Sequence, residues 1–292
     1  MDNLSGRICL VTGATNGIGE VTALELARMG ATVVIIGRNE DKAKATIAKI
    51  KSAVANADVD YLIADLSLMR DVKRVAEAFR AKYSRLDVLV NNAGMVFDKR
   101  IASAEGLEIT FALNHMNYFY LTTLLLDMLK ASGTSSQKSR VVSVSSGAHQ
   151  LGTPNFDDLQ FEKKYSSFRA YGQSKMMNIL FTNELSRQLT SENANVTANS
   201  LHPGAVKTGF GANSSGIMRS LISLVRPFFL TPEQGAQTSI YLASSPEVEG
   251  VSGKYFSKSK PTKTHKNADN TALQTQLWAY SQDTLKKLGL EA

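Results

Sequence analysis

The chain has 292 residues, 43% of them hydrophobic, which is enough to bury a substantial core. Because α/β folds of this length commonly form one domain, we expect a single domain over residues 1–292. Cys9 is the only cysteine, so an intramolecular disulfide is excluded and a cytoplasmic location is the simplest expectation. No apolar run approaches the length of a membrane-spanning helix, and the first strand-like run begins too near Met1 for a signal peptide.

The net charge of +7 would permit binding to polyanions or acidic membranes, but most basic residues are interspersed with acids. One segment differs, because residues 254–266 contain five lysines and no acid. This segment lacks the context of a nucleic-acid-binding motif. We therefore interpret it as a solvated loop and expect no nucleic-acid partner.

Short apolar runs alternate with amphipathic segments along the chain. The predicted strands are residues 8–11, 32–36, 59–63, 86–90, 140–144 and 196–201, and the helical segments include 21–29, 40–51 and 68–83. The strands are continuous hydrophobic runs, which is typical of strands buried on both faces. This order predicts an α/β Rossmann fold, a doubly wound parallel sheet of about seven strands with helices on both faces.

A glycine-rich turn separates the first predicted strand from the first predicted helix. Its sequence from Thr12 to Gly19 is T-G-A-T-N-G-I-G, and glycines there let the backbone approach a dinucleotide pyrophosphate at a helix N-terminus. A P-loop is excluded because no Gly-Lys-Ser/Thr follows. The spacing departs from G-x-G-x-x-G, so a purely structural turn is the alternative. The candidate cofactor contacts are Gly13, Thr15, Asn16, Gly17, Ile18 and Gly19.

The end of the second predicted strand bears on the choice of cofactor. An NAD-specific site would place an acidic residue there for the ribose 2′-hydroxyl, but the sequence has Arg38. A guanidinium can form two charge-assisted bonds with a 2′-phosphate, so Arg38 favours NADP(H) over NAD(H), unless it is only an exposed strand-end residue. Asp65, followed by Leu66, could accept a bond from the adenine amino group or cap a helix that starts near Ser67.

Tyr171 and Lys175 are four residues apart, so on a helix their side chains would be neighbours. A nearby ammonium lowers the pKa of a tyrosine, which suits such a pair to proton transfer. The spacing alone is a weak signal, since helices often carry both residues on a solvated face. It gains weight from the N-N-A-G motif at 91–94, from Asn114 in an apolar helix, and from Ser145 and Ser146 after the fifth strand.

Together and in this order, these motifs resemble those of the short-chain dehydrogenase/reductase family, over nearly the whole chain from Gly6 to about Tyr255. S-G-A-H at 146–149, K-M-M-N-I-L-F at 175–181, H-P-G at 202–204 and L-W at 277–278 resemble the retinol dehydrogenase and WW-domain oxidoreductase branch. The resemblance implies NADP(H)-dependent hydride transfer to or from a carbonyl or alcohol carbon.

The resemblance also implies individual roles. Tyr171 would be the general acid/base, and Lys175 would lower its pKa and bind the nicotinamide ribose. Ser146 would bind the substrate oxygen, with Ser145 open as the alternative, and Asn114 would hold a water that links Lys175 to solvent. Asn114 could instead satisfy backbone groups, and Ser146 could be a strand-end cap. Further implied cofactor contacts are Asn92, Ala93, Gly94, Pro203, Gly204, Val206 and Thr208.

Three segments lie outside the core pattern. Residues 205–230 are rich in apolar side chains and could form a lid over a lipophilic aldehyde, ketone or alcohol, a packing or subunit surface, or a shallow peripheral membrane contact. Residues 151–168 form an insertion that we expect at the pocket rim. Residues after about 256 form a C-terminal extension. By resemblance we expect a homodimer or homotetramer.

Other function classes are less consistent with the residues. None of the four histidines is paired at ligand spacing with another histidine or a cysteine, so we predict no metal site. No G-x-S-x-G elbow is present, which disfavours a serine hydrolase. A sensor or scaffold could bind NADPH with the same fold and without turnover, but such a protein has no need of the full Asn-Ser-Tyr-Lys set.

Overall fold

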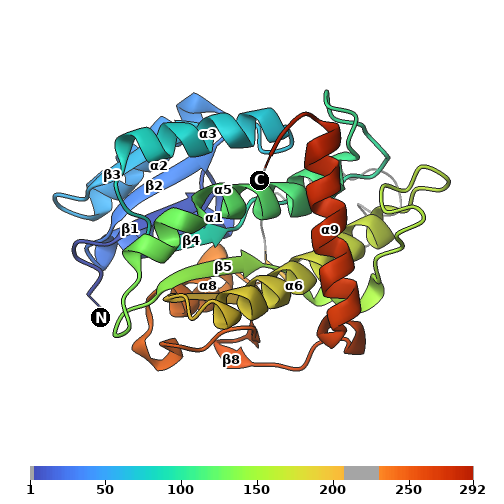
Figure 1. The fold of residues 1–292 in the computed structure, drawn as a ribbon. Coiled ribbons are helices and arrows are strands. Elements are labelled where there is room, and N and C mark those ends of the chain that lie inside the picture. Colours follow the sequence, from blue (N-terminus) through green and yellow to red (C-terminus); the bar gives the residue numbers. More distant parts are fainter. Residues whose placement is uncertain (1–2, 207–229, 292) are drawn as a thin grey trace.

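The computed structural model describes residues 3–206 and 230–291 (Figure 1). One eight-stranded sheet runs in the order β3-β2-β1-β4-β5-β6-β7-β8. The strands are β1 (Ile8–Thr12), β2 (Thr32–Gly37), β3 (Val59–Ile63), β4 (Val88–Asn91), β5 (Ser139–Val144), β6 (Val196–His202), β7 (Tyr255–Ser257) and β8 (Lys260–Pro261). All pairings are parallel except β7 with β8. The predicted Rossmann-type α/β fold is confirmed, with one short antiparallel strand added at the edge.

Helices alternate with these strands along the chain. The longer ones are α1 (Gly17–Arg28), α2 (Glu40–Ala53), α3 (Met69–Lys82), α5 (Asn117–Ser132), α6 (Ser167–Ser191), α8 (Pro232–Ser244) and α9 (Thr271–Lys287). Shorter elements are α4 (Ile109–Phe111), the π-helical η1 (Ala112–Met116) and the 3₁₀ turns η2 (Gly147–Leu151), η4 (Pro246–Val248) and η5 (Lys266–Asp269). Helix α1 starts four residues before the predicted segment, so its N-terminus lies inside the glycine-rich turn.

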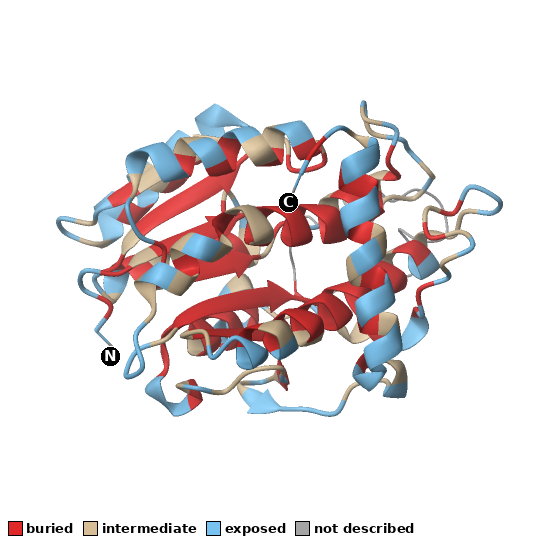
Figure 2. Ribbon diagram, in the orientation of Figure 1, coloured by how far each residue is buried: buried red, intermediate tan, exposed pale blue. Residues whose placement is uncertain are grey.

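Two apolar cores lie on opposite faces of the sheet, because successive strand residues point to opposite sides. Leu10 packs into the core covered by α3, α5 and α6, whereas its neighbours Cys9 and Val11 pack into the core covered by α1, α2 and α8. Helix α9 packs outside α6. Figure 2 shows α5 and α6 buried along most of their length. The helix that carries the Tyr-Lys pair is therefore among the most deeply packed elements.

The sheet topology places the carboxyl ends of all the parallel strands along one edge. The chain moves outward from β1 to β3 and then returns to start β4 on the other side of β1. This reversal creates a crevice between β1 and β4, which is where open α/β sheets bind their ligands. The glycine-rich turn follows β1, and the N-N-A-G motif overlaps the end of β4.

Helix α3 is capped by a residue distant in sequence. Glu105 accepts bonds from the backbone nitrogens of Met69 at 2.6 Å and Arg70 at 3.0 Å. Asp65 instead accepts from the backbone nitrogen and hydroxyl of Ser67 at 3.0 and 2.6 Å, in a turn before the helix. The predicted capping role of Asp65 is therefore wrong, because the helix starts at Met69 and a carboxylate from another loop reaches its free N–H groups.

The structure bears on the predictions made for Cys9, for the lysine-rich segment 254–266 and for membrane-spanning helices. Cys9 is fully buried in the core, where burial raises its pKa to about 12. The five lysines of 254–266 are all exposed, but β7 and β8 make this segment a small hairpin rather than a loop throughout. Among the described residues, no helix is long and apolar enough to cross a bilayer.

Candidate active site

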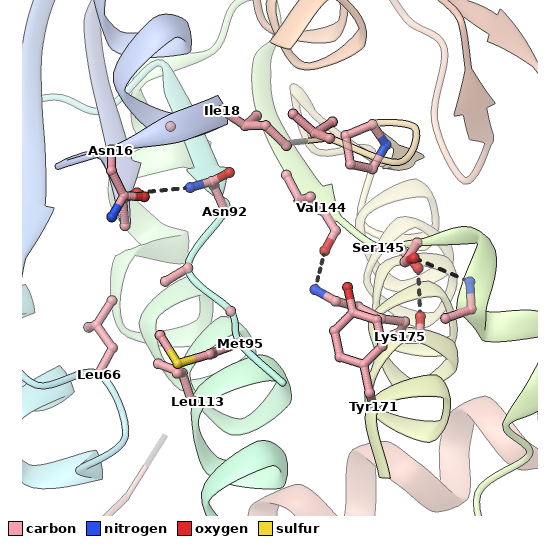
Figure 3. Close-up of a pocket in the computed structure, with 18 of the residues that line it drawn as sticks. Asn16, Ile18, Leu66, Asn92, Met95, Leu113, Val144, Ser145, Tyr171 and Lys175 are labelled. Carbon is pink, nitrogen blue, oxygen red and sulfur yellow. Dashed lines mark hydrogen bonds between the residues drawn. The ribbon is translucent and has the colours of Figure 1, made fainter. Parts of the chain in front are cut away.

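A cavity of about 510 Å³ opens at the carboxyl ends of the strands (Figure 3). It brings together most of the residues that the sequence pointed to. Those lining it are Gly13, Thr15, Asn16, Ile18, Gly19, Arg38, Asp65, Leu66, Asn92, Ala93, Gly94, Ser146, Tyr171, Lys175, Pro203, Gly204 and Val206. Gly17 lies in the same turn, and Asn114 is buried and bonded to Met95, which lines the cavity. Thr208 and most of segment 205–230 lie outside the described residues.

The glycines of the first turn have specific structural reasons. Gly13 and Gly17 have φ of +63° and +56°, which side-chain-bearing residues rarely adopt. A Cβ on Gly13 would lie 2.8 Å from the Cα of Ala93, and one on Gly19 would lie 2.5 Å from Nδ2 of Asn92. The turn therefore packs directly on the N-N-A-G segment and leaves the N-terminus of α1 facing the cavity.

Thr12 and Asn92 fasten this turn to the end of β4. The Thr12 hydroxyl oxygen accepts from the backbone nitrogens of Asn92 at 2.9 Å and Ala93 at 3.0 Å. In return, Nδ2 of Asn92 donates to the carbonyls of Thr12 at 2.8 Å and Gly13 at 3.2 Å. Sequence reasoning treated Asn92 as a cofactor contact, and it gave Thr12 no role of its own. Their reciprocal bonds make both residues supports of the turn.

Arg38 and Asp65 face each other at the far end of the cavity. The Arg38 side chain is 74% exposed, and its Nη1 lies 3.9 Å from Oδ2 of Asp65. An exposed ion pair at this distance contributes little stability. The guanidinium is thus available to an anionic ligand at the end of β2. The adjacent Gly37 has no room for a side chain, since a Cβ would lie 2.4 Å from Cγ2 of Thr15.

Tyr171 and Lys175 lie at the opposite end, on α6. The Nζ of Lys175 donates to the carbonyl of Val144 at 3.0 Å, and Nζ is 5.6 Å from the centre of the Tyr171 ring (Figure 3). The Lys175 residue is only 3% exposed. Helical spacing alone predicted this adjacency, but the burial of Lys175 comes from the packing of α6 against the sheet.

The ionisation of the pair differs from the sequence-based expectation. Burial raises the pKa of Tyr171 to about 12, and the hydrogen bond with Ser146 opposes this only in part. Burial also lowers the pKa of Lys175 to about 7. In the protein without a ligand, burial therefore outweighs any lowering of the Tyr171 pKa by Lys175, because the loss of water disfavours both the phenolate and the ammonium. The lowering expected with the oxidised cofactor bound stays a prediction.

The two adjacent serines point to different partners. The Ser145 hydroxyl donates to the carbonyl of Lys175 at 2.7 Å and is nearly inaccessible. The Ser146 hydroxyl interacts with Tyr171 and accepts from the backbone nitrogen of Ala148 at 3.2 Å. The capping alternative for Ser146 is thus observed at η2, and its hydroxyl also faces Tyr171, whereas its role in binding the substrate oxygen stays a prediction.

Asn114 lies in the π-helical element η1, a distortion often found at functional sites. Its Oδ1 accepts from the backbone nitrogen of Met95 at 2.8 Å, and its Nδ2 donates to the carbonyl of Met95 and to the hydroxyl of Ser174, both at 3.0 Å. The alternative that Asn114 satisfies backbone groups is thus observed. A Cβ on Gly94 would lie 3.1 Å from its Oδ1 and 3.2 Å from Nζ of Lys175.

The sequence did not reveal an apolar wall of the cavity. This wall is formed by Met95, Phe97, Ile109 and Leu113, together with Leu151 and Phe168 at the rim. The expected contribution of insertion 151–168 to the rim is confirmed, and Leu151 and Phe168 are exposed large hydrophobic side chains. The residues between 95 and 113 have no distinctive spacing, so only proximity to N-N-A-G could have signalled them.

The histidines form no metal centre in the part of the chain that the structure describes. His149 bonds to the carbonyl of Ser146 at 2.7 Å, and His202 accepts from the backbone nitrogen of Gly147 at 3.1 Å. Both hold the loops that frame the cavity. His115 is buried in η1 and bonds to the hydroxyl of Ser281 at 3.0 Å.

Sequence comparison assigns this site to a family. The family model described as short chain dehydrogenase matches residues 7–216. The chain belongs to the short-chain dehydrogenase family. This short-chain dehydrogenase is 42% identical to human polyprenol dehydrogenase, covering 94% of the chain and 84% of the relative. It is 41% identical to human retinol dehydrogenase 14, with coverages of 96% and 86%.

Solved structures agree with this family assignment. The structure of an uncharacterized protein from Mycobacterium paratuberculosis matches this chain with a TM-score of 0.79 and 30% identity. The match covers 100% of this chain and 96% of the Mycobacterium protein. The RhlG/NADP active-site complex of Pseudomonas aeruginosa matches with a TM-score of 0.69 and 28% identity, over 87% and 95% of the two chains. The fold is thus that of an oxidoreductase family whose members bind nicotinamide cofactors.

Proposed function

We propose that the protein is an NADP(H)-dependent oxidoreductase that acts on a lipophilic aldehyde, ketone or alcohol. The observation that carries this proposal is one cavity with the glycine-rich turn at one end and the Tyr-Lys pair at the other (Figure 3). A pure cofactor-binding protein needs only the first end. Hydride transfer also needs a group that exchanges a proton with the substrate oxygen.

The described residues fit a dinucleotide. The turn 13–19 presents glycine backbone at the start of α1, where a pyrophosphate would meet the free N–H groups and the positive end of the helix. Arg38 would bind the 2′-phosphate, which favours NADP(H) over NAD(H). When bound, the nicotinamide supplies or accepts the hydride. Further contacts are proposed for Asn92, Ala93, Gly94, Pro203, Gly204 and Val206, and by resemblance for Thr208.

We assign to Tyr171 the exchange of a proton with the substrate oxygen. Its hydroxyl would protonate the developing alkoxide in reduction and remove the alcohol proton in oxidation, while the Ser146 hydroxyl holds the same oxygen. Tyr171 would lose its proton more readily beside the positive charge of the oxidised cofactor, which offsets the effect of burial. Lys175 would bind the ribose, and Asn114 would connect it toward solvent.

The substrate class follows from the apolar wall. Met95, Phe97, Ile109 and Leu113 offer no charge to a ligand in the cavity, and Leu151 and Phe168 add apolar surface at the rim. Such a lining suits a long-chain or ring-bearing carbonyl compound. The names of the relatives, polyprenol and retinol dehydrogenase, point to the same class.

Several coarser features remain proposals. We infer one domain over residues 1–292, supported by the single sheet, with residues 205–230 as a lid that could also meet a membrane surface. A homodimer or homotetramer and a cytoplasmic location are proposed from the family resemblance and from the lone buried cysteine.

The test is oxidation of NADPH and NADH with a panel of retinal, aliphatic and aromatic carbonyl compounds, with Tyr171→Phe as the comparison. We expect activity with NADPH that falls about 10²- to 10⁴-fold in the variant, the usual contribution of general acid/base catalysis. NADPH affinity should persist. Tight NADPH binding with no turnover on any compound would instead indicate a sensor or scaffold.

A further inference from the structure

The carbonyl oxygen of Val144, at the end of β5, is the meeting point of three buried donors. Lys175 donates to it from α6 at 3.0 Å, Asn178 donates from the same helix at 3.4 Å, and Tyr118 donates from α5 at 3.4 Å. Asn178 and Tyr118 are both fully buried. The oxygen therefore links two helices and a strand at the point where Lys175 is held.

A carbonyl oxygen has two lone pairs, so three donors must share them. The shortest bond belongs to Lys175, and the other two are long for hydrogen bonds. The N–H and O–H dipoles of Asn178 and Tyr118 point their positive ends at the same oxygen. Both effects reduce the stabilisation that this oxygen gives to a positive charge on Lys175.

The other titratable groups near the pair include two tyrosines. Nζ of Lys175 is 5.8 Å from the centre of the Tyr118 ring and 5.6 Å from that of Tyr171. Tyr118 from α5 and Tyr255 from β7 each interact electrostatically with Tyr171. His202 lines the same cavity from the end of β6. Burial lowers the pKa of Lys175.

We propose that Tyr118 and Asn178 are positioning residues that hold the Val144 carbonyl and limit how strongly it stabilises the Lys175 ammonium. The ammonium then stays free to turn from this carbonyl toward a bound ligand. Neither residue lines the cavity, and each reaches Lys175 through the shared Val144 carbonyl. The consequence for catalysis rests on the proposed function, whereas the effect on Lys175 itself does not.

Tyr118→Phe removes one of the competing donors and keeps the buried ring. The Val144 carbonyl should then bind Lys175 more strongly and raise its pKa by about half a unit, the size of one weak neutral hydrogen bond. A more persistent ammonium stabilises the Tyr171 phenolate. The acidic limb of the pH profile of kcat for alcohol oxidation should therefore move to lower pH. Asn178→Leu should act in the same direction.

The first measurement is NMR titration of ¹³Cε-labelled lysine in the full chain without cofactor. Lys175 should titrate near neutral pH, far below ordinary lysines, and Lys175→Arg identifies its signal. The second measurement is the kcat pH profile. The matched control is Tyr120→Phe, which deletes the same atom from a buried tyrosine of α5 whose hydroxyl has no hydrogen-bond partner among the described residues.

The outcomes separate the two proposals. A raised Lys175 pKa in Tyr118→Phe, absent from the control, supports the positioning role even if no substrate is turned over. An unchanged or lowered Lys175 pKa in both Tyr118→Phe and Asn178→Leu overturns it, whatever the activity. Where turnover is found, a shift of the acidic limb to higher pH would also contradict it.

Discussion

At the scale of single residues, Arg38 is the side chain that we propose distinguishes NADPH from NADH. We expect Arg38→Ala to weaken NADPH binding about 10- to 100-fold, because a charge-assisted bond to phosphate contributes roughly 1.5–3 kcal/mol. NADH binding should change little, since NADH carries no 2′-phosphate. Fluorescence titration with both cofactors measures this. Arg28→Ala, at the C-terminal end of α1, is the control. An equal loss of affinity for NADPH and NADH in Arg38→Ala would argue against the assignment.

His115 gives the protein a predictable sensitivity to acid. Burial lowers its pKa from 6.5 to about 3, so between these values the unfolded chain binds a proton that the folded protein does not. Stability therefore falls as pH drops below 6.5, by about 1.4 kcal/mol per pH unit for this group. From pH 7 to pH 5 both proteins should lose free energy of unfolding. The loss should be roughly 2 kcal/mol smaller in His115→Gln, because this variant lacks the buried histidine. Urea titrations at the two pH values give the comparison, and identical losses would refute it.

At the scale of elements, helix α3 depends on a cap that lies beyond its own sequence. Glu105→Ala should lower the free energy of unfolding by about 1–2 kcal/mol, because two free N–H groups lose their acceptor at the positive end of the helix. Urea denaturation measures the change. Glu77→Ala, an exposed site on the same helix, should have little effect. Equal effects of the two variants would mean that the cap is not stabilising.

At the scale of the whole molecule, contacts between aromatic rings join the C-terminal helix α9 to helices α5 and α6. Trp278 lies 4.9 Å from Phe119 and 5.9 Å from Phe181, measured between ring centres. We expect Trp278→Ala to lower stability by about 3 kcal/mol through the cavity it leaves, and Trp278→Phe to lower it less. NADPH affinity should be retained, since these rings do not line the cavity. Circular dichroism in urea and NADPH titration together test this, and a collapse of affinity would contradict it.

The alternation of strands and helices, the glycine-rich turn and the adjacency of Tyr171 and Lys175 could all be predicted from the sequence alone. These features are local, because strand periodicity, glycine conformation and helical spacing act over a few residues. They place the glycine-rich turn directly after β1, and the Tyr-Lys pair on α6, the long helix that follows β5. The family assignment rests on the same local motifs.

Properties that depend on contacts between residues far apart in sequence could be read only from the tertiary structure. Glu105 reaches α3 across a loop, Ser145 turns away to a carbonyl of α6 while Ser146 faces Tyr171, and the apolar wall assembles from segments with no shared spacing. The direction of the Tyr171 pKa shift is also of this kind. Burial and through-space contacts set these properties. Local sequence patterns do not predict them, because both arise from packing between helices and strands that are far apart in sequence.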